Sequence, residues 1–327
     1  MSLTPTAPTA RPAARGNPVA RFVANNGALV GLVILCVALW IATPHFMTTD
    51  NVLNVVVQAS TIGLLAFGQT FVIVAAGIDL SVGSVAAFAA MVACWLSANV
   101  GWPGPVALVA GLVLGLVVGV VSGVSIAYGK LPAFIGTLAM LSVARGLTLV
   151  VSDGRPIGTP DAISFLGSDI GGFPVPIIVF AIGGVVCSFV LTRTVAGRSM
   201  YAVGGNLEAA RLAGLPVKRI LVTVFALSGV YAALAGMLLA GRLNSAQPQA
   251  ASGYELDAIA AVVIGGASLS GGSGRASGTL VGALILAVIR NGLNILNVSS
   301  FWQQVVIGLV IAVAVGIDVL RRKNTHP

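Results

Sequence analysis

Residues 193–219 read RTVAGRSMYAVGGNLEAARLAGLPVKR and form the longest polar interval between the apolar runs of this chain. The sequence on either side is hydrophobic enough to lie in lipid. A basic, glycine-containing segment between membrane spans is a place where a cytoplasmic partner can bind. The interval carries five basic residues, which are Arg193, Arg198, Arg211, Lys218 and Arg219.

The composition excludes a water-soluble globular protein. Hydrophobic residues make up 57% of the 327 residues and charged residues 8%, against about 45–50% and about 25% in soluble domains. The apolar runs are continuous rather than alternating, which excludes a transmembrane β-barrel. The 41 glycines are typical of helices that pack closely in lipid. The sequence therefore predicts an all-α polytopic membrane protein in the lipid bilayer.

A membrane-spanning helix needs about 20 apolar residues, and this length predicts ten spans. Residues 1–20 are rich in Pro, Thr, Ala and Arg, so we interpret them as a disordered cytoplasmic tail before a single transmembrane domain over 21–327. The predicted spans are 27–43, 54–76, 80–98, 105–127, 131–151, 174–192, 220–241, 256–271, 277–296 and 300–320.

The distribution of basic residues predicts the orientation of these spans. Cytoplasmic loops of membrane proteins carry an excess of Lys and Arg. With ten spans and a cytoplasmic N-terminus, every Lys and Arg falls in a cytoplasmic segment except Arg145, Arg155, Arg242 and Arg290. We therefore expect both termini in the cytoplasm. The net charge of +8 then reflects this bias and not the binding of nucleic acid.

Two glycine-containing strings match one another. Gly77-Ile-Asp-Leu-Ser-Val-Gly83 and Gly266-Ala-Ser-Leu-Ser-Gly-Gly272 share the pattern G-x-x-L-S-x-G, and each separates two apolar runs. Paired interruptions of this kind often mark broken helices near a transport pathway. Chance similarity in a chain rich in Gly and Ser is the alternative.

The sequence gives no sign of bond chemistry. It contains no G-x-x-x-x-G-K-[ST] phosphate loop, no catalytic triad and no cluster of metal ligands. Charged residues inside the spans become the functional candidates, because burying a charge in lipid costs at least about 2.5–3.5 kcal/mol. Asp79 either caps the following span or contacts cargo. Arg145 and Arg290 either face the pathway or extend to the membrane surface.

Within the 193–219 loop, the residues from Asn206 to Gly214 predict a short helix. Asn206 is a good N-cap residue and Gly214 a good terminator, and Glu208 can pair weakly with Arg211. A helix of about two turns is not stable alone in water, so it must pack against a partner or rest on the membrane. A partner could approach closely over its small residues, Ala209, Ala210 and Ala213.

From about Asn51 to Arg322 the chain resembles the membrane permease subunits of ribose-type ABC sugar importers. The residues 1–20 lie outside this resemblance. Several strings in the same order carry it, and these are Gly68-Gln-Thr-Phe-Val-Ile, Gly77-Ile-Asp-Leu-Ser-Val-Gly83, Leu131-Pro-Ala-Phe-Ile, Ala144-Arg-Gly146, Gly154-Arg-Pro-Ile157, Tyr201-Ala-Val-Gly-Gly-Asn206 and Ile264-Gly-Gly-Ala-Ser-Leu-Ser-Gly-Gly-Ser-Gly274.

The resemblance implies a ten-span permease of the vitamin-B12-permease-like, type II importer architecture in the bacterial inner (cytoplasmic) membrane. Its implied partners are a second permease copy, expected to form a homodimer, a cytoplasmic ABC ATPase subunit and a periplasmic sugar-binding protein. ATP and Mg would sit on the ATPase, and this chain would bind no cofactor.

In such importers a short cytoplasmic coupling helix docks into a groove on the ATPase. The residues here that match it are Gly205, Asn206, Ala209, Ala210 and Gly214, and Glu208 and Arg211 belong to the same candidate surface. The candidates for the pathway or for broken helices are Gln69, Gly77, Asp79, Gly83, Arg145, Gly266, Ser270 and Asn291. The outside basic residues Arg155 and Arg242 are candidates for contact with the binding protein.

The expected function is import of a pentose or hexose by alternating access. Amides such as Gln69 and Asn291 suit a path for a neutral sugar, although they could equally join helices. A nucleoside or a branched-chain amino acid is an alternative cargo. An ion-coupled secondary transporter, with Asp79 as its membrane acid, and a structural or receptor-like subunit are the rival classes.

Overall fold

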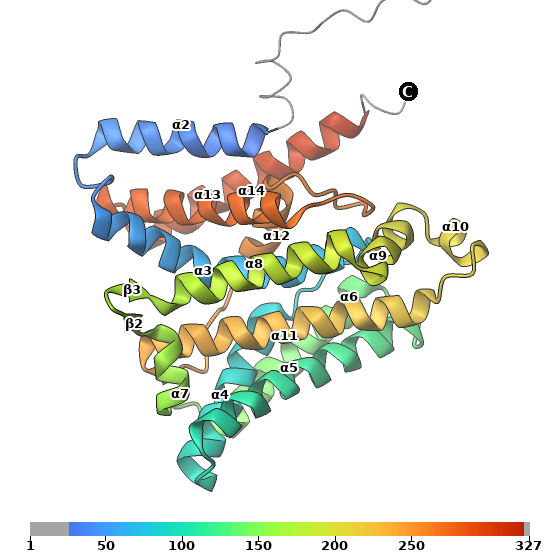
Figure 1. Ribbon diagram of the computed structural model, residues 1–327, viewed down its shortest axis with the longest axis horizontal. Coiled ribbons are helices and arrows are strands. Elements are labelled where there is room, and N and C mark those ends of the chain that lie inside the picture. The colour runs from blue at the N-terminus through green and yellow to red at the C-terminus, as the bar shows by residue number, and fades with distance from the viewer. Residues whose placement is uncertain (1–25, 324–327) are drawn as a thin grey trace, which may run out of the picture.

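The computed structural model describes residues 26–323 and is predominantly helical (Figure 1). The predicted tail over 1–20 lies outside the described residues. The long helices are α2 (Gly27–Ala42), α3 (Thr49–Val74), α4 (Val82–Val100), α5 (Gly104–Ala127), α6 (Ala133–Ser152), α8 (Val175–Arg193), α11 (Val217–Leu243), α13 (Ala276–Ile295) and α14 (Ser300–Lys323).

Short elements connect the long helices. The helical ones are α7 (Asp161–Ser164), a 3-10 turn at Phe165–Gly167, α9 (Val195–Gly205), α10 (Leu207–Leu212) and α12 (Tyr254–Ile264). Two antiparallel pairs of two-residue strands, which the sequence did not predict, join β1 (Ile157–Gly158) to β4 (Ser245–Ala246) and β2 (Asp169–Ile170) to β3 (Phe173–Pro174).

Seven helices of the described chain are long and apolar enough to cross a membrane, and the apolar α2 and residues 300–313 of α14 are shorter. The prediction of a helical, multi-pass membrane protein is therefore confirmed. The seven are α3, α4, α5, α6, α8, α11 and α13.

Helix α3 is the centre of the core, because every residue from Ala59 to Val74 is buried. The neighbouring helices α8, α11, α12 and α13 pack around it. Its Phe67 ring stacks on Phe180 of α8, with ring centroids 5.4 Å apart, and meets the edge of Tyr231 from α11. Because these helices are closely packed on α3, a displacement at either end of α3 would also shift most of the other helices.

The predicted span 256–271 is wrong at its second half. Helix α12 ends at Ile264 because Gly266 adopts a left-handed conformation, with φ of 92°, that few other residues accept. With 11 residues, α12 is about 16 Å long, which is half of the roughly 30 Å hydrocarbon core. The chain over 244–253 that precedes α12 is mostly non-helical.

The bundle has two distinct ends (Figure 1). One carries α9 and α10 and is named the α10 end here, and the other, the α7 end, carries α7 and the strand pair β2–β3. In Figure 1, the start of α2 and the end of α14 are the ends of these helices that lie nearer to α10. The sequence predicted one helix in the 193–219 loop, but α9 is a second, started by the Thr194 side chain, which accepts a hydrogen bond from the Gly197 backbone N–H at 3.0 Å.

Candidate functional site

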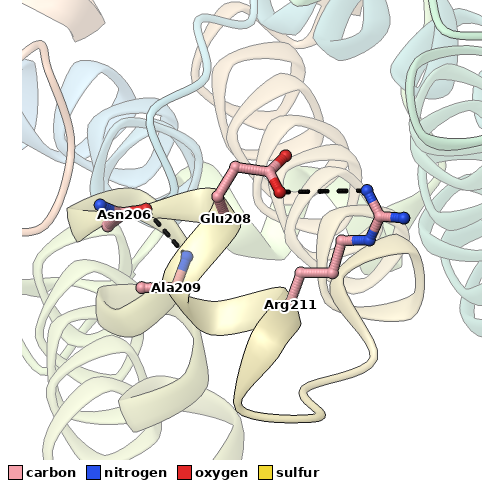
Figure 2. A network of polar contacts seen from close by, with 4 residues as sticks. All are labelled: Asn206, Glu208, Ala209 and Arg211. Carbon is pink, nitrogen blue, oxygen red and sulfur yellow. Dashed lines mark hydrogen bonds and ion pairs between the residues drawn. The ribbon is translucent and has the colours of Figure 1, made fainter.

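The predicted short helix of the 193–219 loop is present as α10 (Figure 2). The Asn206 side-chain oxygen accepts a hydrogen bond from the Ala209 backbone N–H at 2.9 Å, as an N-cap does. Gly214 follows the helix in the left-handed conformation, with φ of 79°. Glu208 and Arg211 are 4.0 Å apart with exposed side chains, so their ion pair adds little stability.

The two faces of α10 differ from what the small residues predicted. Ala210 is 4% exposed and packs into the core of its own chain. Leu212 is 88% exposed and Leu207 46%, and Ala209 is exposed as well. A partner that meets α10 therefore meets an apolar surface with charged neighbours. With 3.6 residues per turn, Leu212 and Ala210 lie on nearly opposite sides of the helix. The sequence therefore indicated that the two side chains could not both face the same partner.

The last turn of α9 lies directly on two other segments. Gly204 is so close to α3 that a Cβ there would be 1.9 Å from the Val74 carbonyl oxygen. The same oxygen accepts a hydrogen bond from the Gly272 N–H, at 2.9 Å, in the loop between α12 and α13. Tyr201 donates to the Gly274 carbonyl at 2.7 Å, and burial raises the pKa of its phenol. We name Tyr201, Gly204, Val74, Gly272 and Gly274 the α9 junction.

Asp79 lies in the break between α3 and α4 and is 3% exposed. Its carboxylate accepts hydrogen bonds from the Ser81 N–H at 2.9 Å, the Ser81 hydroxyl at 2.6 Å and the Ser228 hydroxyl at 2.8 Å. The buried Gln69 amide faces the Asp79 backbone. These partners favour a structural role at the break over contact with cargo, although the N-cap residue of α4 is Ser81 and not Asp79.

The two matching glycine strings lie at similar helix ends, but their registers differ by one residue. Ala76 and Gly77 donate to carbonyls three and five residues earlier at the end of α3, and Gly266 and Ala267 do the same after α12. Ala76 and Gly266, with φ of 60° and 92°, therefore occupy equivalent positions. Ser270 lies exposed in the loop that follows α12.

Two further polar residues join helices to one another. Asn291 in α13 and Asn51 in α3 exchange hydrogen bonds through both side-chain amides, at 2.8 and 3.0 Å. Arg290 forms an ion pair with Asp257 of α12. Asp257 lies in that helix and is 3% exposed. These contacts fit a helix-joining role for Asn291 and Arg290.

The remaining arginines differ in their exposure. Arg145 is half-buried, and its Nη1 donates to the Pro248 and Ala250 carbonyls at 2.8 and 3.0 Å. Arg155 is exposed just after α6. Arg242 reaches back to the Thr61 hydroxyl of α3 at 3.4 Å. It also lines a surface hollow of about 450 Å³ at the α7 end, with Asp161 among the other lining residues.

Gly83, the last of the predicted pathway residues, lies in the first turn of α4, where it meets the chain just before α12 and the first turn of that helix. A Cβ there would be 2.5 Å from both the Ala251 carbonyl oxygen and the Glu255 carboxylate. Glu255, which directly precedes the predicted span 256–271, was not among the site residues predicted from the sequence.

Comparison with known proteins gives consistent matches over most of the chain. Residues 51–315 match the family described as branched-chain amino acid transport system / permease component. The chain is 49% identical to the ribose import permease protein RbsC of Bacillus subtilis (strain 168) over 304 residues, which cover 91% of this chain and 93% of the relative.

Two relatives from Escherichia coli (strain K12) are similar over comparable lengths. The ribose import permease protein RbsC is 44% identical, over 89% of this chain and 92% of the relative. The L-arabinose transport system permease protein AraH is 41% identical, over 91% of each chain. No solved structure matches the chain significantly.

Proposed function

Because the chain belongs to the family of branched-chain amino acid transport system permease components and is similar to ribose and arabinose permeases over nine-tenths of its length, we propose that it imports a monosaccharide as the membrane subunit of an ATP-driven ABC transporter. The single observation that carries the proposal is the 49% identity to a ribose import permease. The chain is a transport subunit and not an ATPase.

The partners follow from this role. A cytoplasmic ABC ATPase subunit binds ATP and Mg, a periplasmic binding protein delivers the sugar, and a second copy of this chain completes the permease in the bacterial inner membrane. ATP binding closes the ATPases and moves the spans between an outward-open and an inward-open state. Each partner shifts this equilibrium only by binding one state more tightly than the other.

The arrangement of the ends supports ten crossings of the type II importer architecture, with both termini in the cytoplasm. Helix α11 ends at the α7 end, and α13 begins beside Tyr201 at the α10 end. Residues 244–275 between them must therefore cross the bundle, with α12 as the helical half of that crossing. The start of α2 and the end of α14 both lie on the side nearer to α10, which supports a cytoplasmic α10 end.

The coupling helix is α10, with the ATPase docking on its exposed side. Leu207 and Leu212 form the apolar part of that side and Glu208 and Arg211 the charged part. Large apolar side chains exposed on a short polar segment often mark an interaction surface. The α9 junction connects α10 to α3 and to the loop before α13, so it is the route by which docking moves the spans.

The binding protein docks at the α7 end, the periplasmic side in this orientation. Arg155 is the exposed basic residue there, and Arg242 contributes from within its surface hollow. Charged residues at the rim of an interface act mainly on the rate of association. Their role is therefore expected in the rate of binding-protein docking more than in its final strength.

The proposal is tested by purification and uptake. The chain, tagged at its C-terminus and taken from native membranes in mild detergent, is expected to bring a nearly equimolar protein with phosphate-loop and signature motifs. Liposomes that hold this complex, given the binding protein and ATP, should accumulate ribose, arabinose or another monosaccharide. Uptake of leucine or a nucleoside in place of a sugar would show that the assigned cargo is wrong. Uptake by the isolated chain without ATP would overturn the whole proposal.

A further inference from the structure

Arg145 and Glu255 lie near one another within the membrane-spanning part of the chain without forming an ion pair. Arg145 donates to the Ala250 carbonyl, and the neighbouring Ala251 carbonyl lies with the Glu255 carboxylate against Gly83. Among the described residues, however, no Arg145 nitrogen lies within 4.0 Å of a Glu255 oxygen. Neither side chain is buried. The nearby Arg290 and Asp257, by contrast, are joined directly.

Both residues lie deep in the bundle rather than at its surface ends. Arg145 is seven residues before the end of α6 at Ser152, which is about 10 Å along the helix. The Glu255 carboxylate lies against Gly83 in the first turn of α4. That turn is about 25 Å along α4 from its last residue, Val100.

The hydrogen-bonding capacity of this pair is only partly used. The Arg145 guanidinium donates to the described chain only through Nη1, which bonds two carbonyls of the segment before α12. The N–H groups of Nε and Nη2 therefore remain as donors for another molecule. Glu255 accepts no hydrogen bond from the residues that the structure describes, and an ionised carboxylate is an acceptor only.

Polar and small residues lie beside the pair, although the apolar Leu149 of α6 and Leu256 of α12 are exposed there as well. Ser142 and Gly146 of α6 are exposed beside Arg145, and Ser252 and Gly253 are exposed just before α12. Ionisable residues at membrane depth almost always face a water-filled cavity or another protein group. The donors and acceptors of Arg145 and Glu255 that have no partner in the described chain are therefore suited to contact with water or a polar ligand.

We propose that Arg145 and Glu255 form a contact site for the transported solute, which is a neutral polyhydroxyl compound. Arg145 donates hydrogen bonds to solute hydroxyl oxygens, and Glu255 accepts hydrogen bonds from solute hydroxyl groups. The two opposite charges give the site no net charge, which suits a sugar better than a simple anion or cation. This inference rests on the proposed function, because the sugar cargo comes from that proposal.

The first test measures uptake of D-ribose, L-arabinose and leucine by liposomes with the full complex. Glu255→Gln keeps the shape of the side chain but loses its charge, and we expect uptake of the transported sugar to fall about tenfold, since hydrogen bonds to charged groups are roughly twice as strong as neutral ones. Arg145→Gln should have a similar effect. ATP hydrolysis stimulated by the binding protein should remain as in the wild type.

A matched pair of variants separates this site from a structural role. Asp257→Asn breaks the buried pair with Arg290, so it should reduce the amount of folded complex. Glu255→Gln should leave that amount unchanged. Uptake at the wild-type rate by both Glu255→Gln and Arg145→Gln would overturn the inference, as would a loss of folded complex in both. Failure of the wild-type complex to import any sugar would instead overturn the proposed function.

A second test measures water access without relying on transport. In a chain with Cys36, Cys94 and Cys187 replaced by Ala, Ser142→Cys and Val143→Cys place thiols at the same depth about 100° apart on α6. We expect a charged methanethiosulfonate to label Ser142→Cys much faster than Val143→Cys, and the transported sugar to slow the reaction. Absence of labelling at 142, or equal labelling at both positions, would show that no polar path runs along this face.

Discussion

The side-chain amide of Gln69 pairs with the backbone of Asp79 through two hydrogen bonds of 3.1 Å. In the orientation that satisfies both groups, its nitrogen donates to the Asp79 carbonyl and its oxygen accepts from the Asp79 N–H. Gln69 is completely buried in α3. A non-helical segment inside a membrane protein needs internal partners for its backbone groups, and Gln69 supplies them at the point where the chain turns toward α4.

Gln69→Leu should therefore destabilise the protein. It leaves a buried N–H and a buried carbonyl of Asp79 unpaired, at a cost of about 1–3 kcal/mol for each group. We expect a lower melting temperature in detergent and less folded protein in membranes. Gln58→Leu is the control, since Gln58 lies in the same helix, is half-buried and has no hydrogen bond among the described residues. Equal melting temperatures for the two variants would contradict this assignment.

Asp79 distinguishes the proposed importer from an ion-coupled transporter. Its carboxylate is held by Ser81 and Ser228, and an asparagine can still accept from Ser81 through its carbonyl oxygen while donating to the Ser228 hydroxyl. Asp79→Asn should therefore keep most ATP-driven uptake, and Asp79→Ala should lower stability by leaving both serines without their partner. Uptake lost in Asp79→Asn, with the protein folded and ATP hydrolysis intact, would favour a proton- or cation-coupled role.

The sequence predicted the long helices well because each of them is a continuous apolar run. Such runs are longer than the apolar stretches found in helices of water-soluble proteins. The run 105–127 corresponds to α5 at Gly104–Ala127, and 174–192 to α8 at Val175–Arg193. Span 256–271 was placed too far along because a hydropathy argument assumes that a whole crossing is helical. Here an irregular segment over 244–253 precedes the 11-residue α12.

Side-chain partners were harder to predict than helices. The N-cap of α10 follows from Asn206 alone, because capping is a local property. Ala210 points inward because of the way α10 packs on the rest of the chain. A hydropathy profile carries no information about that packing. Likewise, Glu255 and Arg145 are 110 residues apart in the sequence, and only the fold brings them together.

The outer face of α10 offers a direct test of ATPase docking. Leu212→Asp replaces a side chain that is 88% exposed, so the chain should fold normally. Burial of a leucine contributes about 1.5–3 kcal/mol, and its loss should weaken ATPase binding at least about tenfold. The measurement is the amount of ATPase that copurifies, together with uptake.

Two controls accompany the α10 test. Glu208→Gln changes a charge in an exposed, weak ion pair and should alter binding far less than Leu212→Asp. Ala210→Asp should loosen α10 itself, because Ala210 is 4% exposed and packs into the core of its own chain. Normal ATPase recovery with Leu212→Asp would mean that α10 does not present this face to the ATPase.

Two neighbouring glycines test the α9 junction. At Gly204 a Cβ would be 1.9 Å from the Val74 carbonyl oxygen and 2.8 Å from the Gly272 nitrogen, whereas at Gly205 a Cβ has no neighbour within 4 Å. Gly204→Ala must push α9 away from α3, because both of those neighbours are backbone atoms. Gly205→Ala needs no such movement, although both variants add one methyl group in the same helical turn.

We expect Gly204→Ala to leave ATP hydrolysis in the assembled complex but to lower the sugar moved per ATP, since α10 would no longer be fixed to α3. The measurements are uptake and phosphate release on the same liposomes, after melting curves of the isolated chain have shown how much stability is lost. Gly205→Ala should match the wild type in stability. If the two variants behave alike in both measurements, the contact between Gly204 and Val74 does not carry movement from α10 to the spans.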